Sequence, residues 1–153
     1  MQLSLQSDYA LRILLALAAC DRQLSVDDVS RQYGISRNHL AKVAQRLQAE
    51  GLVQTFRGRG GGMRLLQRPQ DICVGQIVRK FENCSAFVSC FPAASGCVID
   101  GVCGLKPALS GAIEAFLSHL DGYFLADLIP HKDLLRDRLD VVLAQSRGVS
   151  EPL

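Results

Sequence analysis

The feature that most constrains the fold is a pair of helical segments separated by only three residues, Tyr33-Gly34-Ile35. Ser25, followed by two acids, marks the start of a helix that runs to about Gln32. Ser36 marks the start of the next helix, which ends near Glu50, before a glycine. Two helices joined by a tight turn with a central glycine are typical of a helix-turn-helix.

The second of these helices separates an apolar face from a polar one. Its apolar residues recur at three- and four-residue spacing: Leu40, Val43, Ala44 and Leu47. The opposite face carries Asn38, Lys42 and Gln45 and no acid, and such side chains pair with base edges or phosphates. Ser36 and Arg37 stand at its start, Arg46 flanks the apolar stripe, and His39 is assigned to the DNA side. We therefore expect a DNA recognition helix here, rather than an ordinary solvated face of mixed charge.

An extended pattern follows, with two apolar runs at 52–56 and 63–66 around Arg57-Gly-Arg-Gly-Gly-Gly62. Glycines allow close backbone approach, and arginines on a thin tip can enter a minor groove. Arg57 and Arg59 are therefore predicted to bind DNA. A nucleotide-binding loop is excluded, because no helix with a Lys-Ser/Thr start follows the glycines. Together with a buried first helix at 8–19, which Asp8 or Ser7 could cap, this hairpin predicts a winged helix-turn-helix.

Charge is divided unevenly along the chain. Residues 1–68 hold ten Lys and Arg against five acids, whereas residues 69–153 hold seven against ten. A basic half suggests a polyanionic partner. The longest apolar run, 11–20, is too short to span a membrane, and residues 1–9 lack the Lys or Arg of a signal peptide. We expect a cytoplasmic protein in a reducing compartment, with no membrane partner.

The second half predicts a short helix at 72–81 and a long one from Pro107 to about Ala126. The long helix has a broad apolar stripe that one small winged helix cannot cover, so we expect it to pack on a second copy. The predicted organisation is a mainly α fold with a small β-hairpin wing. Its parts are a DNA-binding domain at 1–68, a connecting helix and cysteine loop at 69–106, a dimerisation helix at 107–129 and a flexible, weakly helical tail at 130–153.

Residues 83–105, here called the cysteine segment, contain Cys84, Cys90, Cys97 and Cys103. The spacing Cys90-x6-Cys97-x5-Cys103 is too wide for a zinc knuckle. Three thiolates on one loop suit an iron–sulfur cluster, which needs a fourth donor from elsewhere. Two alternatives stay open, namely buried structural cysteines and a clusterless thiol switch. Cys84 is either a bystander or a spare thiol.

Several motifs in order resemble the Rrf2 family of winged-helix iron–sulfur regulators, over about residues 1–129. The motifs are Met1-Gln-Leu3, Asp8-Tyr-Ala-Leu-Arg12, Tyr33-Gly-Ile-Ser-Arg-Asn-His39, Arg57-Gly-Arg-Gly-Gly-Gly62, Cys103-Gly-Leu-Lys106 and Leu120-Asp-Gly-Tyr-Phe-Leu-Ala-Asp-Leu128. The resemblance is strongest to the nitric-oxide-sensing repressors of that family. It implies a homodimer that binds double-stranded operator DNA and responds to nitric oxide, not an enzyme.

The resemblance also implies a set of cluster ligands: Cys90, Cys97 and Cys103 from one subunit and Asp8 from its partner. Without the family, a helix cap would be the simpler role for Asp8. A 4Fe–4S cluster is favoured over 2Fe–2S. Lys106 occupies the place of a ligating histidine in the cluster-assembly regulators of the family, which counts against that branch. An iron- or redox-responsive repressor remains an alternative, and an electron-transfer protein or enzyme is disfavoured by the basic helix and wing.

Overall fold

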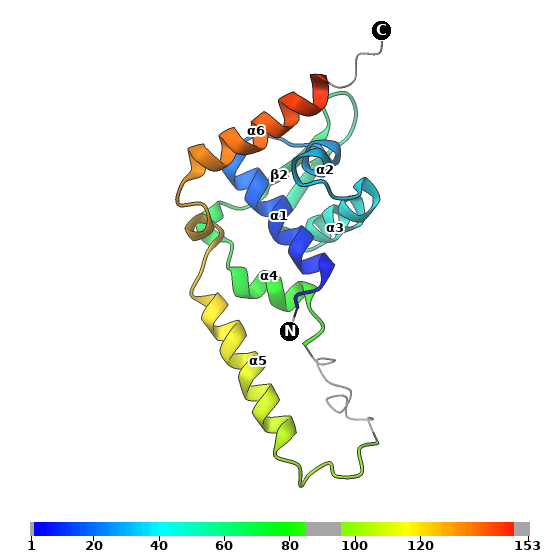
Figure 1. The fold of residues 1–153 in the computed structure, drawn as a ribbon, viewed down its shortest axis with the longest axis vertical. Coiled ribbons are helices and arrows are strands. Elements are labelled where there is room, and N and C mark those ends of the chain that lie inside the picture. Colours follow the sequence, from blue (N-terminus) through cyan, green and yellow to red (C-terminus); the bar gives the residue numbers. More distant parts are fainter. Residues whose placement is uncertain (1, 85–95, 149–153) are drawn as a thin grey trace.

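A computed structural model describes residues 2–84 and 96–148, and in these ranges the chain is mainly helical with one two-stranded antiparallel hairpin (Figure 1). This confirms the expected fold class. The elements are α1 (Leu5–Cys20), α2 (Val26–Tyr33), α3 (Arg37–Ala49), β1 (Val53–Phe56), β2 (Gly62–Leu65), η1 (Pro69–Asp71), α4 (Val74–Phe81), α5 (Leu105–Asp121), η3 (Leu125–Leu128) and α6 (Lys132–Gly148).

Helix α1 runs through the centre of the body and contacts α3, α4, α6 and β2. Its side chains at Ala10, Ile13 and Leu14 are fully buried. Its cap is Ser4, whose hydroxyl accepts a hydrogen bond from the Ser7 amide at 3.2 Å. The expectation that Ser7 or Asp8 caps the helix is therefore wrong, because the helix begins one turn earlier. In the described part of the chain, no helix is long and apolar enough to cross a bilayer.

The helix-turn-helix follows its sequence signals closely. The Ser25 hydroxyl accepts from the Asp28 amide at 3.0 Å, and the Asp28 carboxylate accepts from the Ser25 amide at 3.0 Å. Gly34 ends α2 with φ +64°, a conformation that disfavours any side chain with a Cβ. Helix α3 then starts after Ser36, as expected, although the Ser36 side chain makes no capping hydrogen bond.

The wing is the hairpin of β1 and β2, in register from Val53 opposite Leu65 to Phe56 opposite Gly62. Leu24 extends this hairpin with one bridge to Met63. The Met63 amide donates to the Leu24 carbonyl at 2.7 Å, and the Leu24 amide donates back at 3.1 Å. Because Met63 is 1% exposed, the base of the wing is fixed to the helical core.

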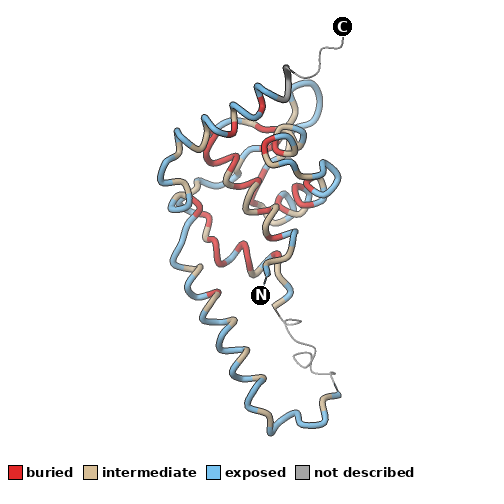
Figure 2. Tube along the Cα trace, in the orientation of Figure 1, coloured by how far each residue is buried: buried red, intermediate tan, exposed pale blue. Residues whose placement is uncertain are grey.

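Helix α5 extends away from the body and is mostly exposed (Figures 1 and 2). Leu117 is its one buried residue, and the helix contacts α4. The helix ends at Asp121, five residues before the predicted end near Ala126. The difference arises because Phe124 is extended and pairs with Cys73, with the Leu125 amide donating to the Ile72 carbonyl at 2.9 Å.

Residues 132–148 form a packed helix instead of the flexible tail expected from the sequence. Helix α6 lies against α1 and α2, and its Leu139 and Leu143 are 6% and 5% exposed. This packing is not evident from the sequence, because charged residues interrupt an apolar stripe of period four. The α6 stripe therefore completes the core around the C-terminal half of α1.

Candidate DNA interface and cluster site

One side of α3 is buried and the other is open to solvent. The buried side chains are those expected: Leu40, Val43, Ala44 and Leu47. Most of the predicted DNA-contacting residues are exposed: Ser36, Arg37, Asn38, His39, Lys42 and Gln45. The open side therefore presents amide, cationic and imidazole groups on a rigid helix. This is the donor and acceptor set that base edges and phosphates require.

Two of these side chains have neighbours that the sequence did not reveal. Arg37 Nε lies 2.6 Å from Asp27 Oδ1 on α2. The acid-free face of α3 is therefore bordered by one acid from the preceding helix. The His39 ring stacks on the Tyr9 ring of α1, with centroids 6.3 Å apart. Stacking orients the imidazole while leaving His39 exposed.

Arg46 differs from the rest of the predicted DNA-binding set. Its guanidinium donates to Gln6 Oε1 at 2.6 Å and to the Lys80 carbonyl, and it lies over the Phe81 ring with 4.5 Å to the centroid. These partners come from α1 and α4. In this structure the Arg46 guanidinium therefore bonds to groups of the protein, although Arg46 lines the same surface pocket as His39 and Lys42.

The tip of the wing carries Arg57 and Arg59, and both are exposed. Gly58 and Gly60 adopt φ +94° and +76°, and the Gly61 amide closes the turn on the Gly58 carbonyl at 2.9 Å. The glycines make a narrow tip with a cation on each side of Gly58. Such a tip suits entry into a minor groove.

The cysteine segment is described only in part, because Cys90 lies outside the described residues. Cys97 and Cys103 are half-buried. Cys103 Sγ accepts from the Leu105 amide at 3.4 Å, at the first residue of α5. An amide donor at a helix start stabilises negative charge on sulfur, as a metal-bound thiolate requires. The Cys103 sulfur fits this ligand role. Among the described residues, no group of three His, Cys, Asp or Glu side chains is close enough to hold a metal.

Asp8 lies in the first turn of α1, with its carboxylate on Arg12. Arg12 Nε donates to Asp8 Oδ2 at 2.9 Å and to Oδ1 at 3.0 Å, and both side chains are partly exposed. This pair raises the pKa of Arg12 above its ordinary value, chiefly through the hydrogen bond to Asp8. In the described part of one chain, Asp8, Cys97 and Cys103 do not form a common cluster.

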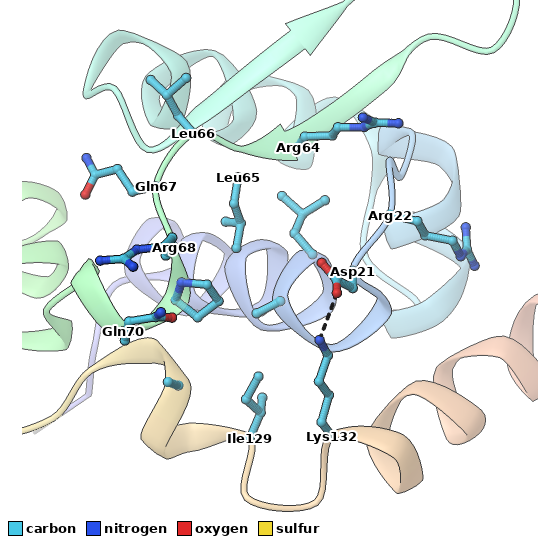
Figure 3. Close-up of a pocket in the computed structure, with 14 residues that line it drawn as sticks. Asp21, Arg22, Arg64, Leu65, Leu66, Gln67, Arg68, Gln70, Ile129 and Lys132 are labelled. Carbon is cyan, nitrogen blue, oxygen red and sulfur yellow. Dashed lines mark hydrogen bonds and ion pairs between the residues drawn. The ribbon is translucent and has the colours of Figure 1, made fainter.

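A cavity of about 660 Å³ lies between β2, the end of α1 and the start of α6 (Figure 3). Leu65 points into it, whereas the cations of Arg22 and Arg64 point away (Figure 3). Lys132 Nζ pairs with Asp21 at 3.1 Å at its edge. Its lining holds one acid and no histidine or cysteine, so the cavity lacks the paired groups of an active site.

A winged helix with an exposed cationic recognition surface is typical of DNA-binding transcriptional regulators. The family model for Rrf2, described as an iron-dependent transcriptional regulator, matches residues 3–131. The chain belongs to the Rrf2 family.

Curated relatives and solved structures agree with this assignment. The chain is 47% identical over 137 residues to the HTH-type transcriptional regulator NsrR of Bacillus subtilis, covering 87% of this chain and 93% of the relative. It is 43% identical over 142 residues to NsrR of Geobacillus kaustophilus, covering 91% and 97%. The structure of CymR, the global cysteine regulator of B. subtilis, matches with a TM-score of 0.67, 27% identity and coverage of 84% and 95%. IscR of T. potens shares the fold, with a TM-score of 0.65, 24% identity and coverage of 90% and 88%.

Proposed function

We propose that this chain is a homodimeric repressor that binds operator DNA in the cytoplasm and releases it when nitric oxide attacks an iron–sulfur cluster. The observation that carries the DNA-binding part is the exposed face of α3 beside a wing tip with two arginines. The sensing part is supported by the thiols before α5 and by similarity to regulators named NsrR.

Within residues 1–68, Asn38 and Gln45 are assigned to base edges of the major groove, Lys42 to a phosphate beside that groove, and Arg57 and Arg59 to the flanking minor groove. Ser36, Arg37 and His39 stand beside them as backbone contacts or base contacts near the start of α3. In a two-fold dimer, the two recognition helices would enter major grooves about 34 Å apart, which predicts a nearly palindromic operator.

The dimer contact is assigned to α5, within residues 107–129. Leu109, Ile113, Phe116 and Leu120 are only half-buried in a single chain, although they form one apolar stripe. Packing that stripe on the same helix of a partner removes it from water. A dimer through α5 also places Cys103, two residues before the start of α5, close to that interface.

The cluster is assigned to Cys90, Cys97 and Cys103 of one subunit with Asp8 of the partner, and 4Fe–4S is the type proposed. When bound, it supplies iron that nitric oxide can attack. A carboxylate is a weaker ligand than a thiolate for such iron, so Asp8 marks the most exchangeable position. Arg12 already pairs with both oxygens of Asp8, so ligation requires Arg12 to release or share that carboxylate.

A second candidate is an iron-responsive repressor, which the family's description as iron-dependent favours. A histidine-ligated cluster of the cluster-assembly type is disfavoured. Lys106 occupies the corresponding position, and its ammonium pairs with Asp100 Oδ1 at 3.1 Å. Iron withdrawal and nitric oxide are therefore the two signals to compare.

The test is an anaerobic absorption spectrum of freshly purified protein, titrated with nitric oxide while operator binding is measured. We expect a brown protein that loses its absorbance at about 400 nm and its DNA binding together. If DNA binding is lost on iron chelation but not with nitric oxide, the protein is an iron-responsive repressor. A colourless protein whose DNA binding depends on oxidants would select the thiol switch instead.

Asp8→Ala and Arg12→Gln separate the ligand role of Asp8 from its ion pair. We expect Asp8→Ala to retain a cluster with altered nitrosylation kinetics. Arg12→Gln keeps the carboxylate and removes the cation that competes for it, so it should not reproduce the Asp8→Ala change. Unchanged kinetics and DNA affinity in Asp8→Ala would remove Asp8 from the ligand set.

A further inference from the structure

The last turn of α4 is joined to α5 through Arg79. Its guanidinium pairs with the Asp121 carboxylate and lies 3.4 Å from Glu114 Oε1. Asp121 sits so close to the start of α4 that a Cβ on Gly75 would lie 2.1 Å from Asp121 Oδ1. The C-terminal end of α5 is therefore held against α4 by an ion pair and by close backbone approach.

The next residues of α4 are joined to α3. Lys80 Nζ lies 2.7 Å from Glu50 Oε2, just beyond the last residue of α3. The pair lowers the pKa of the Glu50 carboxyl, through the hydrogen bond and the charge of Lys80. The Phe81 ring supports the Arg46 guanidinium of α3, and the Lys80 carbonyl accepts from it. Glu50, Arg46, Lys80 and Phe81 are here called the α3–α4 clamp.

Both ends of the cysteine segment connect to this place in the fold. The segment begins at Asn83, two residues after α4 ends, and it returns to the body through α5. Glu82 also accepts a hydrogen bond from the Ser4 amide at 2.7 Å, at the start of α1. Residues 79–82 therefore touch α5, α3 and α1 through four consecutive side chains or carbonyls.

We propose that residues 79–82 couple the cysteine segment to the recognition helix, and that Arg46 is a positioning residue of this coupling instead of a DNA contact. The proposal rests on the proposed function, since it assigns the route between its two sites. A shift of the cysteine segment moves the end of α4 or α5. The α3–α4 clamp then changes the placement of α3 relative to the wing. Lys42, one helical turn before Arg46, stays exposed and is available to phosphate.

The first test separates positioning from DNA contact by the salt dependence of binding. A duplex selected from random sequence by the wild-type protein is titrated at several salt concentrations. Arg46→Gln is expected to weaken binding about fivefold to tenfold, the effect of about one lost hydrogen bond, with the slope of log K against log salt unchanged. The matched control Lys42→Gln is expected to reduce the magnitude of that slope by about one.

Arg46→Lys keeps the charge but loses the planar group that stacks on Phe81 and spans Gln6 and the Lys80 carbonyl. We expect it to bind DNA as weakly as Arg46→Gln. A wild-type affinity for Arg46→Lys, or a slope reduced by about one in Arg46→Gln, would make Arg46 a phosphate contact and overturn the positioning role. Melting temperatures within a few degrees of the wild type check that both variants fold.

The second test measures the ratio of operator affinities between cluster-loaded and cluster-free protein. Lys80→Met breaks the pair with Glu50 and is expected to reduce this ratio at least about fivefold. Lys132→Met is the matched control, because Lys132 is 41% exposed against 40% for Lys80 and pairs with Asp21 at 3.1 Å far from α3. It should keep the full ratio. Hydrogen exchange of the α3 amides provides a second readout and is expected to change with cluster loss in the control but not in Lys80→Met.

A full wild-type ratio in Lys80→Met would overturn the coupling. A wild-type protein with no difference between loaded and cluster-free forms would instead contradict the proposed function, and the salt-dependence test of Arg46 would still decide its role.

Discussion

The packing of α6 gives a stability prediction with a built-in control. Leu139 is 6% exposed and belongs to the central core with residues of α1. Leu→Ala at buried sites costs about 2–5 kcal/mol, depending on how far the surroundings collapse. Because α6 covers the core from one side only, we expect the lower part of that range, about 2–3 kcal/mol. For a chain of this size, such a loss lowers the melting temperature by about 4–12 °C.

Urea unfolding followed by far-ultraviolet circular dichroism, at one fixed protein concentration, measures this loss. Val141→Ala is the control, because Val141 lies on the same helix and is 54% exposed. It is expected to change the free energy of unfolding by less than about 0.5 kcal/mol. If Leu139→Ala and Val141→Ala both fall within that limit, α6 does not stabilise the core, and the placement described above is refuted.

Three further predictions concern single positions. Burial opposes ionisation of Asp28, but hydrogen bonds from Ser25 and the charge of Arg31 outweigh it and lower the pKa of Asp28 below its ordinary 3.8. The ionised Asp28 carboxylate therefore stabilises the folded state at neutral pH, and this stabilisation is lost as the pH falls below that value. Asp28→Asn should lower the free energy of unfolding by about 1 kcal/mol at pH 7 and by less at pH 3, measured by urea unfolding. Gly75→Ala should destabilise by about 1–3 kcal/mol in the same assay, because the added Cβ meets Asp121, whereas Gly111→Ala in an open part of α5 should not. Burial raises the pKa of the Cys20 thiol, so in native cluster-free protein it should react with iodoacetamide far more slowly than in urea; equal rates would contradict its burial.

The parts of the fold that depend on short-range signals were predictable from the sequence. Helix α2 starts after Ser25 and ends before Gly34 as expected, because capping and positive φ are properties of a few adjacent residues. The alternation of exposed and buried residues along α3 was equally visible. The packing of α6 was not, since charged residues obscure the spacing of Leu139 and Leu143.

The candidate site also has parts that the sequence predicts and parts that it does not. The exposed DNA-facing residues on α3 and the wing follow from periodicity. The hydrogen-bond partners of Arg46 do not, because Lys80 and Gln6 lie 34 and 40 positions away in the sequence. No local pattern specifies such a contact, so Arg46 could not be separated from Lys42 by sequence alone. The ligand set of Cys90, Cys97, Cys103 and Asp8 stays a prediction, because Cys90 lies outside the described residues and Asp8 would act across two chains.

In a single chain, helix α5 has the geometry of a lever that is attached to the body near its C-terminal end. The contacts of Glu114 and Asp121 with Arg79 hold its C-terminal part against α4, while its N-terminal part stands clear of the body (Figure 2). Its 17 residues span about 25 Å at about 1.5 Å per residue. A displacement of about 4 Å at Leu105 thus corresponds to a rotation of only about 10° at Asp121. Under the proposed coupling, a large displacement at the start of α5 would therefore reach the Arg79–Asp121 pair as a small rotation.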